Sequence, residues 1–313
     1  MKKSTQFALL LLIAVLGMPT AALPGIVPVN DAEQDPPDEV PEETPEEEPQ
    51  RLAAWPKPDK ELDRQITKDL GRLRKAATEG MEAGGREGLL AAGDAAGPAL
   101  IQALGKERDD DARARVAEVL TAVTGWHHTR LFAEEFEDRS EHVRLFALER
   151  AAAFPDPGIL AAAQAAHAAA EKRAGTKREV ADELYFASLA LASAGSLEGF
   201  DALVERALSD WGDSGRSLRA ATEGLRGPEA TARLAEPLEG DRKHKVAALR
   251  LLAGCGDAET AVPLVRPFLD STDNSIRVAS INALRGIVDG DLPLERMSVF
   301  EAVELAGKWK GRL

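Results

Sequence analysis

Apolar residues recur at helical spacing through most of the chain, and one such pattern repeats from about residue 85 to the C-terminus. Each copy has a turn containing Asp or Ser, an apolar residue, an Arg or Lys, and then small and apolar residues. The clearest copies are 111–117 (DARARVA) and 273–279 (DNSIRVA). Recurrence at a few tens of residues predicts stacked helix pairs that share one continuous core.

The copies can be aligned on the residue that follows the first apolar position of each pair's second helix. This residue is basic in every aligned copy except one, where it is Tyr. The aligned residues are Arg115, Arg144, Tyr185, Arg219, Lys245 and Arg277. Their spacing is irregular, which a stack of helix pairs tolerates because each pair contacts only its neighbours and length changes fall in turns.

Two longer blocks share the same order of residues. Residues 93–104 (GDAAGPALIQAL) parallel 256–269 (GDAETAVPLVRPFL), and each block runs on into an Asp-containing turn and an Arg-led helix. The pattern resembles the HEAT repeat, in the variant related to the phycobilin-lyase-type repeats. The resemblance implies an all-α fold, a right-handed α-α superhelical solenoid of HEAT-like helix pairs. Gly suits the end of a helix, Pro suits its first turn, and Asp at the turn can cap the helix that follows.

The resemblance also implies a structural role for the aligned basic residues. Their side chains would bond to turn Asp residues and to carbonyl groups between repeats. Asp111, Asp241 and Asp273 lie four residues before the basic residue of their repeat, which suits this role. In the alternative, the basic residues form a row that faces a ligand, because second helices line the concave surface of this fold.

Both ends of the repeat region carry a predicted cap helix, which gives a domain over 59–313. Residues 59–78 are charged and have one apolar stripe, made of Leu62, Ile66, Leu70 and Leu73. Residues 298–310 form the second cap helix. Ser298 with Glu301 three positions on predicts a capping box at its start.

The first 22 residues predict a signal peptide. Lys2 and Lys3 precede an apolar stretch at 7–17, and small residues before Leu23 supply a cleavage site. We therefore expect export to the periplasm or the outside of the cell. The alternative is an uncleaved membrane anchor formed by residues 4–29, because the chain carries no charge from Ser4 to Asn30.

Residues 23–58 are rich in Pro and acidic residues, and predict a disordered spacer with little to bury. Its alternative role is a recognition tail for a basic partner or for divalent cations. The formal net charge of the whole chain is −14. Most of the excess lies in this spacer, and the repeat region is only mildly acidic, so a nucleic-acid partner is disfavoured.

The sequence offers little chemistry. It contains no P-loop, dinucleotide fingerprint or nucleophile elbow. His127 and His128 are adjacent, and we interpret them as turn residues whose side chains point in different directions, with no metal bound. Cys255 is the only Cys and is expected to be a small buried apolar residue. We therefore predict no enzyme activity, no cofactor and no metal.

We predict a non-catalytic scaffold that binds another protein or a peptide in the cell envelope, on the concave face of the solenoid. Aromatic and Arg residues are enriched at interface hot spots, which makes Arg144, Tyr185, Trp211 and Arg219 the candidate binding residues. The resemblance also permits a phycobilin-lyase-like cofactor chaperone or lyase. A third possibility is a structural spacer tethered to the membrane by its N-terminus.

Overall fold

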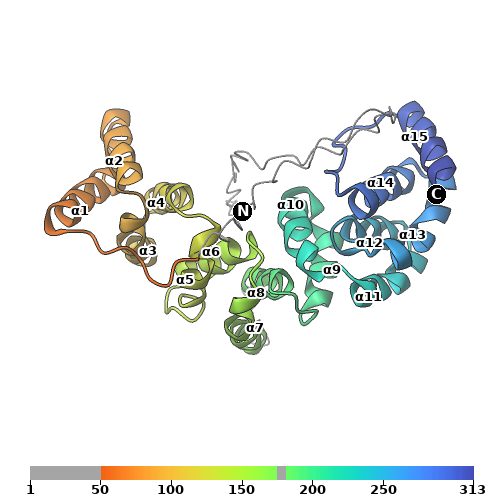
Figure 1. The fold of residues 1–313 in the computed structure, drawn as a ribbon. Helices are drawn as coiled ribbons and strands as arrows, with labels where there is room; N and C mark the ends of the chain where they lie inside the picture. The colour runs from red at the N-terminus through yellow and green to blue at the C-terminus, as the bar shows by residue number, and fades with distance from the viewer. Residues whose placement is uncertain (1–50, 175–180) are drawn as a thin grey trace, which may run out of the picture. The chain divides into compact units, whose positions relative to one another are not determined.

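The computed structural model describes residues 51–174 and 181–313, and every regular element in these ranges is helical (Figure 1). The predicted all-α class is therefore confirmed. The predicted signal peptide and residues 23–50 of the predicted spacer lie outside the described residues. No helix in the described ranges is both long enough and apolar enough to cross a membrane.

The first half of the described chain contains α1 (Lys60–Arg74), α2 (Glu79–Ala92), α3 (Gly97–Lys106), α4 (Asp110–Val123), α5 (Thr129–Ala133), α6 (Glu141–Ala152) and α7 (Leu160–Ala174). The second half contains α8 (Ala181–Ser193), α9 (Phe200–Ser209), α10 (Trp211–Thr222), α11 (Pro228–Glu239), α12 (Arg242–Cys255), α13 (Ala258–Val265), α14 (Asn274–Leu284) and α15 (Val299–Arg312). Short helical turns join several of them. They include the 3₁₀ turns η1 (Gly93–Ala96) and η2 (Trp126–His128) and the π-helical turn η7 (Arg285–Asp289).

Asp side chains begin several helices, because a carboxylate accepts hydrogen bonds from the free N–H groups of a first turn. Asp241 caps α12 and Asp273 caps α14, as the turn pattern predicts. Asp111 does not cap its helix: α4 begins earlier, and Asp109 accepts from the backbone N–H of Ala112. The capping box predicted between Ser298 and Glu301 is confirmed at the start of α15.

The first predicted cap helix is shorter than expected. It ends at Arg74, because Thr78 begins the next helix and accepts a hydrogen bond from the backbone N–H of Met81. The predicted stripe is only partly buried: Ile66 and Leu73 are buried, whereas Leu62 and Leu70 are half-buried. The stripe packs α1 against α2 and α4.

The second helices of successive pairs pack against one another. Contacts join α6 to α8, α8 to α10, α10 to α12, and α12 to α14. The helix that precedes each of α8, α10, α12 and α14 also packs against it. Phe186 of α8 packs against both of the core clusters that the described residues form. Full burial of one large apolar side chain contributes about 1.5–3 kcal/mol, so these helix contacts are a main source of stability in the fold.

Two glycines let the second helices approach closely. A Cβ atom at Gly254 of α12 would overlap the hydroxyl of Thr222 and lie 2.9 Å from the carbonyl oxygen of Arg219, both in α10. A Cβ atom at Gly286 in η7 would overlap the carbonyl oxygen of Ala253 in α12. Backbone atoms cannot turn aside as a side chain can, so these contacts fix the separation of the helices.

Gly286→Ala is expected to lower the free energy of unfolding by about 1–3 kcal/mol, because the new methyl group forces α12 and η7 apart. The matched control is Gly84→Ala in α2, where an added Cβ meets nothing within 4 Å. That change is expected to raise stability by about 0.5–1 kcal/mol, since Ala loses less backbone entropy in a helix. Chemical denaturation measures both, and equal effects would contradict the close approach.

Candidate functional site

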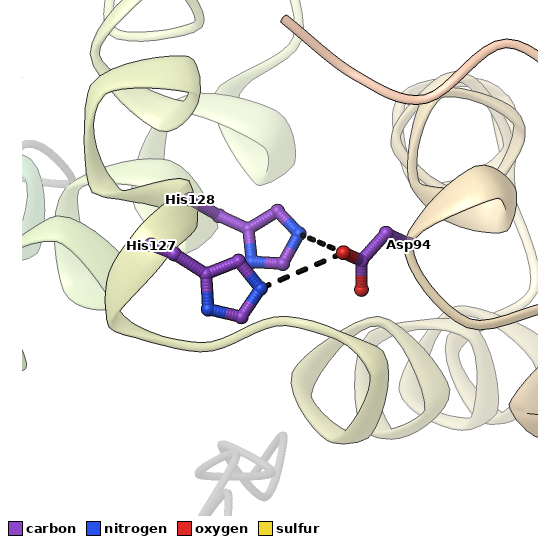
Figure 2. Close-up of side chains that lie close together, drawn as sticks. All are labelled: Asp94, His127 and His128. Carbon is purple, nitrogen blue, oxygen red and sulfur yellow. Dashed lines mark ion pairs between the residues drawn. The ribbon is translucent and has the colours of Figure 1, made fainter. Parts of the chain in front are cut away.

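Two histidines and one carboxylate converge between η1 and η2 (Figure 2). The Nε2 atoms of His127 and His128 each lie 3.5 Å from Oδ2 of Asp94. The expectation that the adjacent His side chains point in different directions is wrong. They lie in a tight 3₁₀ turn, which brings the ring centroids within 4.0 Å of each other. All three residues offer a ligand atom, and these atoms lie within 4.8 Å of one another.

The hydrogen bond on the other side of the His128 ring decides what this cluster can bind. The backbone N–H of Gly125 donates to Nδ1 of His128 at 3.0 Å. Nδ1 therefore keeps its lone pair, and the neutral ring carries its proton on Nε2, toward Asp94. A metal bound at Nε2 needs the opposite tautomer, with a proton on Nδ1 that the Gly125 amide opposes. His127 and Asp94 alone supply fewer ligands than the three of a catalytic zinc site.

The environment of His128 favours its neutral form. The side chain is fully buried. Burial, together with the neighbouring His127, lowers the pKa of His128, while the Asp94 carboxylate acts in the opposite direction. The cluster is therefore best described as a buried imidazole whose Nε2–H faces a carboxylate, and it fits a metal poorly in this conformation.

The first described residues cover this buried ring. Trp55 stacks on His128 with the ring centroids 4.9 Å apart and meets Phe132 edge-on at 5.8 Å. The Leu52 backbone N–H donates to the carbonyl oxygen of His127 at 2.9 Å. Residues 51–58 were predicted to belong to the spacer, but part of this segment is thus attached to the helical region.

Arg51 fixes the start of the same segment. Its guanidinium donates to the carbonyl oxygens of Trp126 and Pro155, each at 2.8 Å, and pairs with Asp156 at 3.1 Å. The sequence did not predict that Arg51 and Trp55 would bind to the helical region. One available signal was that Trp55 is the single aromatic residue between Phe7 and Trp126, in a segment otherwise poor in residues worth burying.

The lowered pKa of His128 predicts a loss of stability in acid. In the unfolded chain His128 takes up a proton at about pH 6.5, whereas in the folded chain it stays neutral to lower pH. Protonation therefore favours the unfolded state, and the free energy of unfolding falls as the pH drops from 7.5 toward 5. His128→Asn keeps an acceptor for Gly125 and removes the titration, so its stability should depend less on pH. His142, whose pKa burial also lowers, is changed separately to Asn so that the two contributions can be told apart. An unchanged slope in His128→Asn would contradict this assignment.

The tautomer predicts that Co²⁺ added to the wild-type chain at neutral pH gives no intense visible band of a tetrahedral site. A wild-type band at one equivalent that disappears in His128→Asn would show that the Gly125 turn opens to let Nε2 bind a metal. Exposed His244, which pairs with Asp241 at 2.9 Å, provides the comparison: His244→Asn should leave the spectrum unchanged.

Two of the predicted protein-binding residues bond within the fold. Tyr185 is buried, and its hydroxyl lies 3.1 Å from Oγ of Ser217. The Arg206 guanidinium lies 4.5 Å from the Tyr185 ring centroid. Arg144 donates through Nε and Nη2 to both carboxylate oxygens of Glu183, at 2.7 and 3.2 Å. This bidentate pair raises the pKa of Arg144 and joins α6 to α8.

The other two predicted binding residues also have partners within the chain. Trp211 is half-buried, with the Arg250 guanidinium 5.0 Å from its ring centroid. Arg219 is only 9% exposed and donates through Nη2 to the carbonyl oxygen of Asp291 at 2.6 Å. These contacts favour structural roles for all four candidates.

The aligned arginines donate to carbonyl groups, and neither Arg115 nor Arg277 bonds to the Asp four positions earlier. Arg115 donates to the carbonyl oxygens of Leu73 and Arg74, at 3.0 and 3.3 Å. Arg277 donates to the carbonyl oxygen of Ser271 at 2.6 Å. Asp273 caps its helix and pairs with Arg242 at 2.5 Å, so its oxygens are engaged by its own helix start and by α12.

Asp241 and Lys245 belong to one copy of the predicted repeat. Asp241 caps α12 and pairs with His244, and its pKa falls to about 2, chiefly because the His244 side chain donates to it. Lys245 is half-buried.

The prediction for Cys255 is confirmed: the thiol is fully buried, and burial raises its pKa to about 12. A thiol in this state is a poor nucleophile.

No model of a known protein family matches the chain, and neither a curated protein nor a solved structure matches it.

Proposed function

We propose that this chain is a non-catalytic protein-binding scaffold whose helix pairs form a HEAT-like solenoid. The observation that carries the proposal is the succession of contacts from α6 through α8, α10 and α12 to α14, each paired with the helix before it. Stacks of this kind present extended surfaces to partners, because each pair adds one segment to a continuous face. Function here follows from the arrangement of helices, so it requires a direct binding test.

Hydrogen bonds from arginine side chains to carbonyl groups of neighbouring elements support a scaffold role. Arg150 of α6 is buried and donates to the carbonyl oxygen of Thr124 at 2.6 Å. Arg226 reaches the carbonyl oxygens of Gly256, Gly286 and Ile287 at 3.3–3.4 Å. These bonds join neighbouring elements and help to hold the surface in one shape before a partner binds, which reduces the entropy lost on association.

We infer that the chain is exported. The order of basic residues, apolar stretch and small residues in 1–22 supports a signal peptide. The single thiol is compatible with an oxidising compartment, because its burial and raised pKa protect it. Release into the periplasm or medium follows if cleavage occurs before Leu23. Retention of residues 4–29 would instead anchor the scaffold to the membrane.

The proposal is tested by identifying a binding partner and measuring its affinity for the chain. The full chain, tagged at its C-terminus, is produced with its own N-terminus, cross-linked in intact cells and isolated, and the attached protein is identified by mass spectrometry. That protein is then purified separately and titrated against the chain, and we expect saturable binding at micromolar affinity or tighter. Failure of every captured protein to bind in purified form would refute the scaffold role. Mass analysis of the mature N-terminus separates release, which begins at Leu23, from anchoring.

A further inference from the structure

Residues 290–298, which we call the strap, connect η7 to α15 without regular secondary structure (Figure 1). Asn282 of α14 recognises the main chain of the strap at Leu294. Its Nδ2 donates to the Leu294 carbonyl oxygen at 3.3 Å, and its Oδ1 accepts from the Leu294 N–H at 2.9 Å. One carboxamide thus satisfies both backbone groups of one residue, which is how a side chain holds an extended peptide of almost any sequence.

Two arginines hold the strap nearer its start. Arg285 donates through Nε to the Leu292 carbonyl oxygen at 3.3 Å, and its Nη2 pairs with the Asp291 carboxylate at 2.9 Å. Arg219 of α10 donates to the Asp291 carbonyl oxygen at 2.6 Å. Helices α10 and α14 and the turn η7 therefore contribute side chains to one surface. That surface binds three main-chain carbonyls, one N–H and one carboxylate of the strap.

The strap is seated on this surface with little apolar burial. Leu292 is 75% exposed, and Asp291, Pro293 and Glu295 are also exposed. Only Leu294 and Met297 are half-buried. A segment that is held by a few polar contacts and buries little apolar area opens at low cost in free energy. Opening of the strap would free the same side chains for another segment.

Arg219 has hydrogen-bond donors that do not bind the strap. Its side chain is nine-tenths buried, yet Nε and Nη1 have no hydrogen-bond partner. Glu223 lies 3.7 Å from Nε, which is an ion-pair distance and not a hydrogen bond. Burial lowers the pKa of Arg219, and the nearby charges of Arg226 and Arg285 act in the same direction. The Glu223 and Asp291 carboxylates act in the opposite direction, and a further acceptor at Nε or Nη1 would add a charge-assisted hydrogen bond.

We propose that Arg219, Asn282 and Arg285 form a binding surface for an extended acidic segment of a partner protein, and that the strap occupies this surface in the unbound chain. The order of the strap, Asp291-Leu292-Pro293-Leu294-Glu295, indicates the ligand: an acidic residue, an apolar residue and Pro, with further acidic residues favoured. The Pro keeps such a segment extended before it binds. The inference rests on the proposed scaffold function and names the surface and the chemistry of the partner.

A labelled synthetic peptide of the strap sequence, residues 290–298, is the probe, and fluorescence anisotropy with the full chain is the measurement. Leu294→Pro in the chain removes the N–H that donates to Asn282, so the strap is held more weakly while Arg219, Asn282 and Arg285 are unchanged. We expect this variant to bind the probe with saturation, and the wild-type chain to bind about tenfold more weakly or worse, because a tethered strap competes at high effective concentration. Glu295→Gln is the matched control, and it should bind as the wild type does.

Adding Asn282→Ala to the Leu294→Pro chain is expected to weaken probe binding by about tenfold, through loss of two hydrogen bonds. Arg285→Gln in the same background provides a second variant should the first unfold, which circular dichroism checks. A probe with Lys in place of Asp291 should not bind. The proposal is overturned if the released chain fails to bind the probe or if Asn282→Ala leaves binding unchanged. If the identified partner binds the wild type and Asn282→Ala equally, the scaffold function stands and this surface is wrong.

Discussion

The structure depends on close packing between successive second helices. A helix that is apolar on two faces cannot bury both against a single partner, so each pair requires neighbours. Gly254 and Gly286 allow backbone to approach backbone where α10, α12 and η7 meet. The numerous alanines of the cores act in the same way with one methyl group each. A fold held by such contacts has little tolerance for added volume at these points, although turns between pairs remain free to vary in length.

Two arginines show how side chains at a helix interface satisfy helix ends. The last carbonyls of a helix have no partner of their own, so a guanidinium from a neighbouring helix can donate to them. Arg115 reaches the end of α1 in this way, and Arg150 reaches the end of α4. These bonds satisfy both the guanidinium and the helix ends, and they connect elements far apart in the sequence.

The sequence was sufficient for what depends on local physics. Helical spacing, the turn Asp residues and the box at Ser298 predicted helices and caps, because those interactions span only a few residues. It was insufficient for contacts that join distant segments, such as Arg51 with Pro155 or Asn282 with the strap. The aromatic residues show the same limit. The ring of Tyr185 lies in the core between helices, and the ring of Trp55, from the predicted spacer, covers His128.

Two non-helical segments are held by side chains that bind main-chain groups, and the difference between them bears on function. Arg51 anchors the N-terminal segment through two carbonyls and a buried carboxylate, and Trp55 adds an aromatic stack on a buried ring. The strap has similar polar contacts but leaves Leu292 in solvent. Apolar burial stabilises a contact wherever it occurs, whereas hydrogen bonds to the main chain are replaced without loss by another peptide. The first segment is therefore a fixed part of the fold, and the second marks a surface suited to exchange.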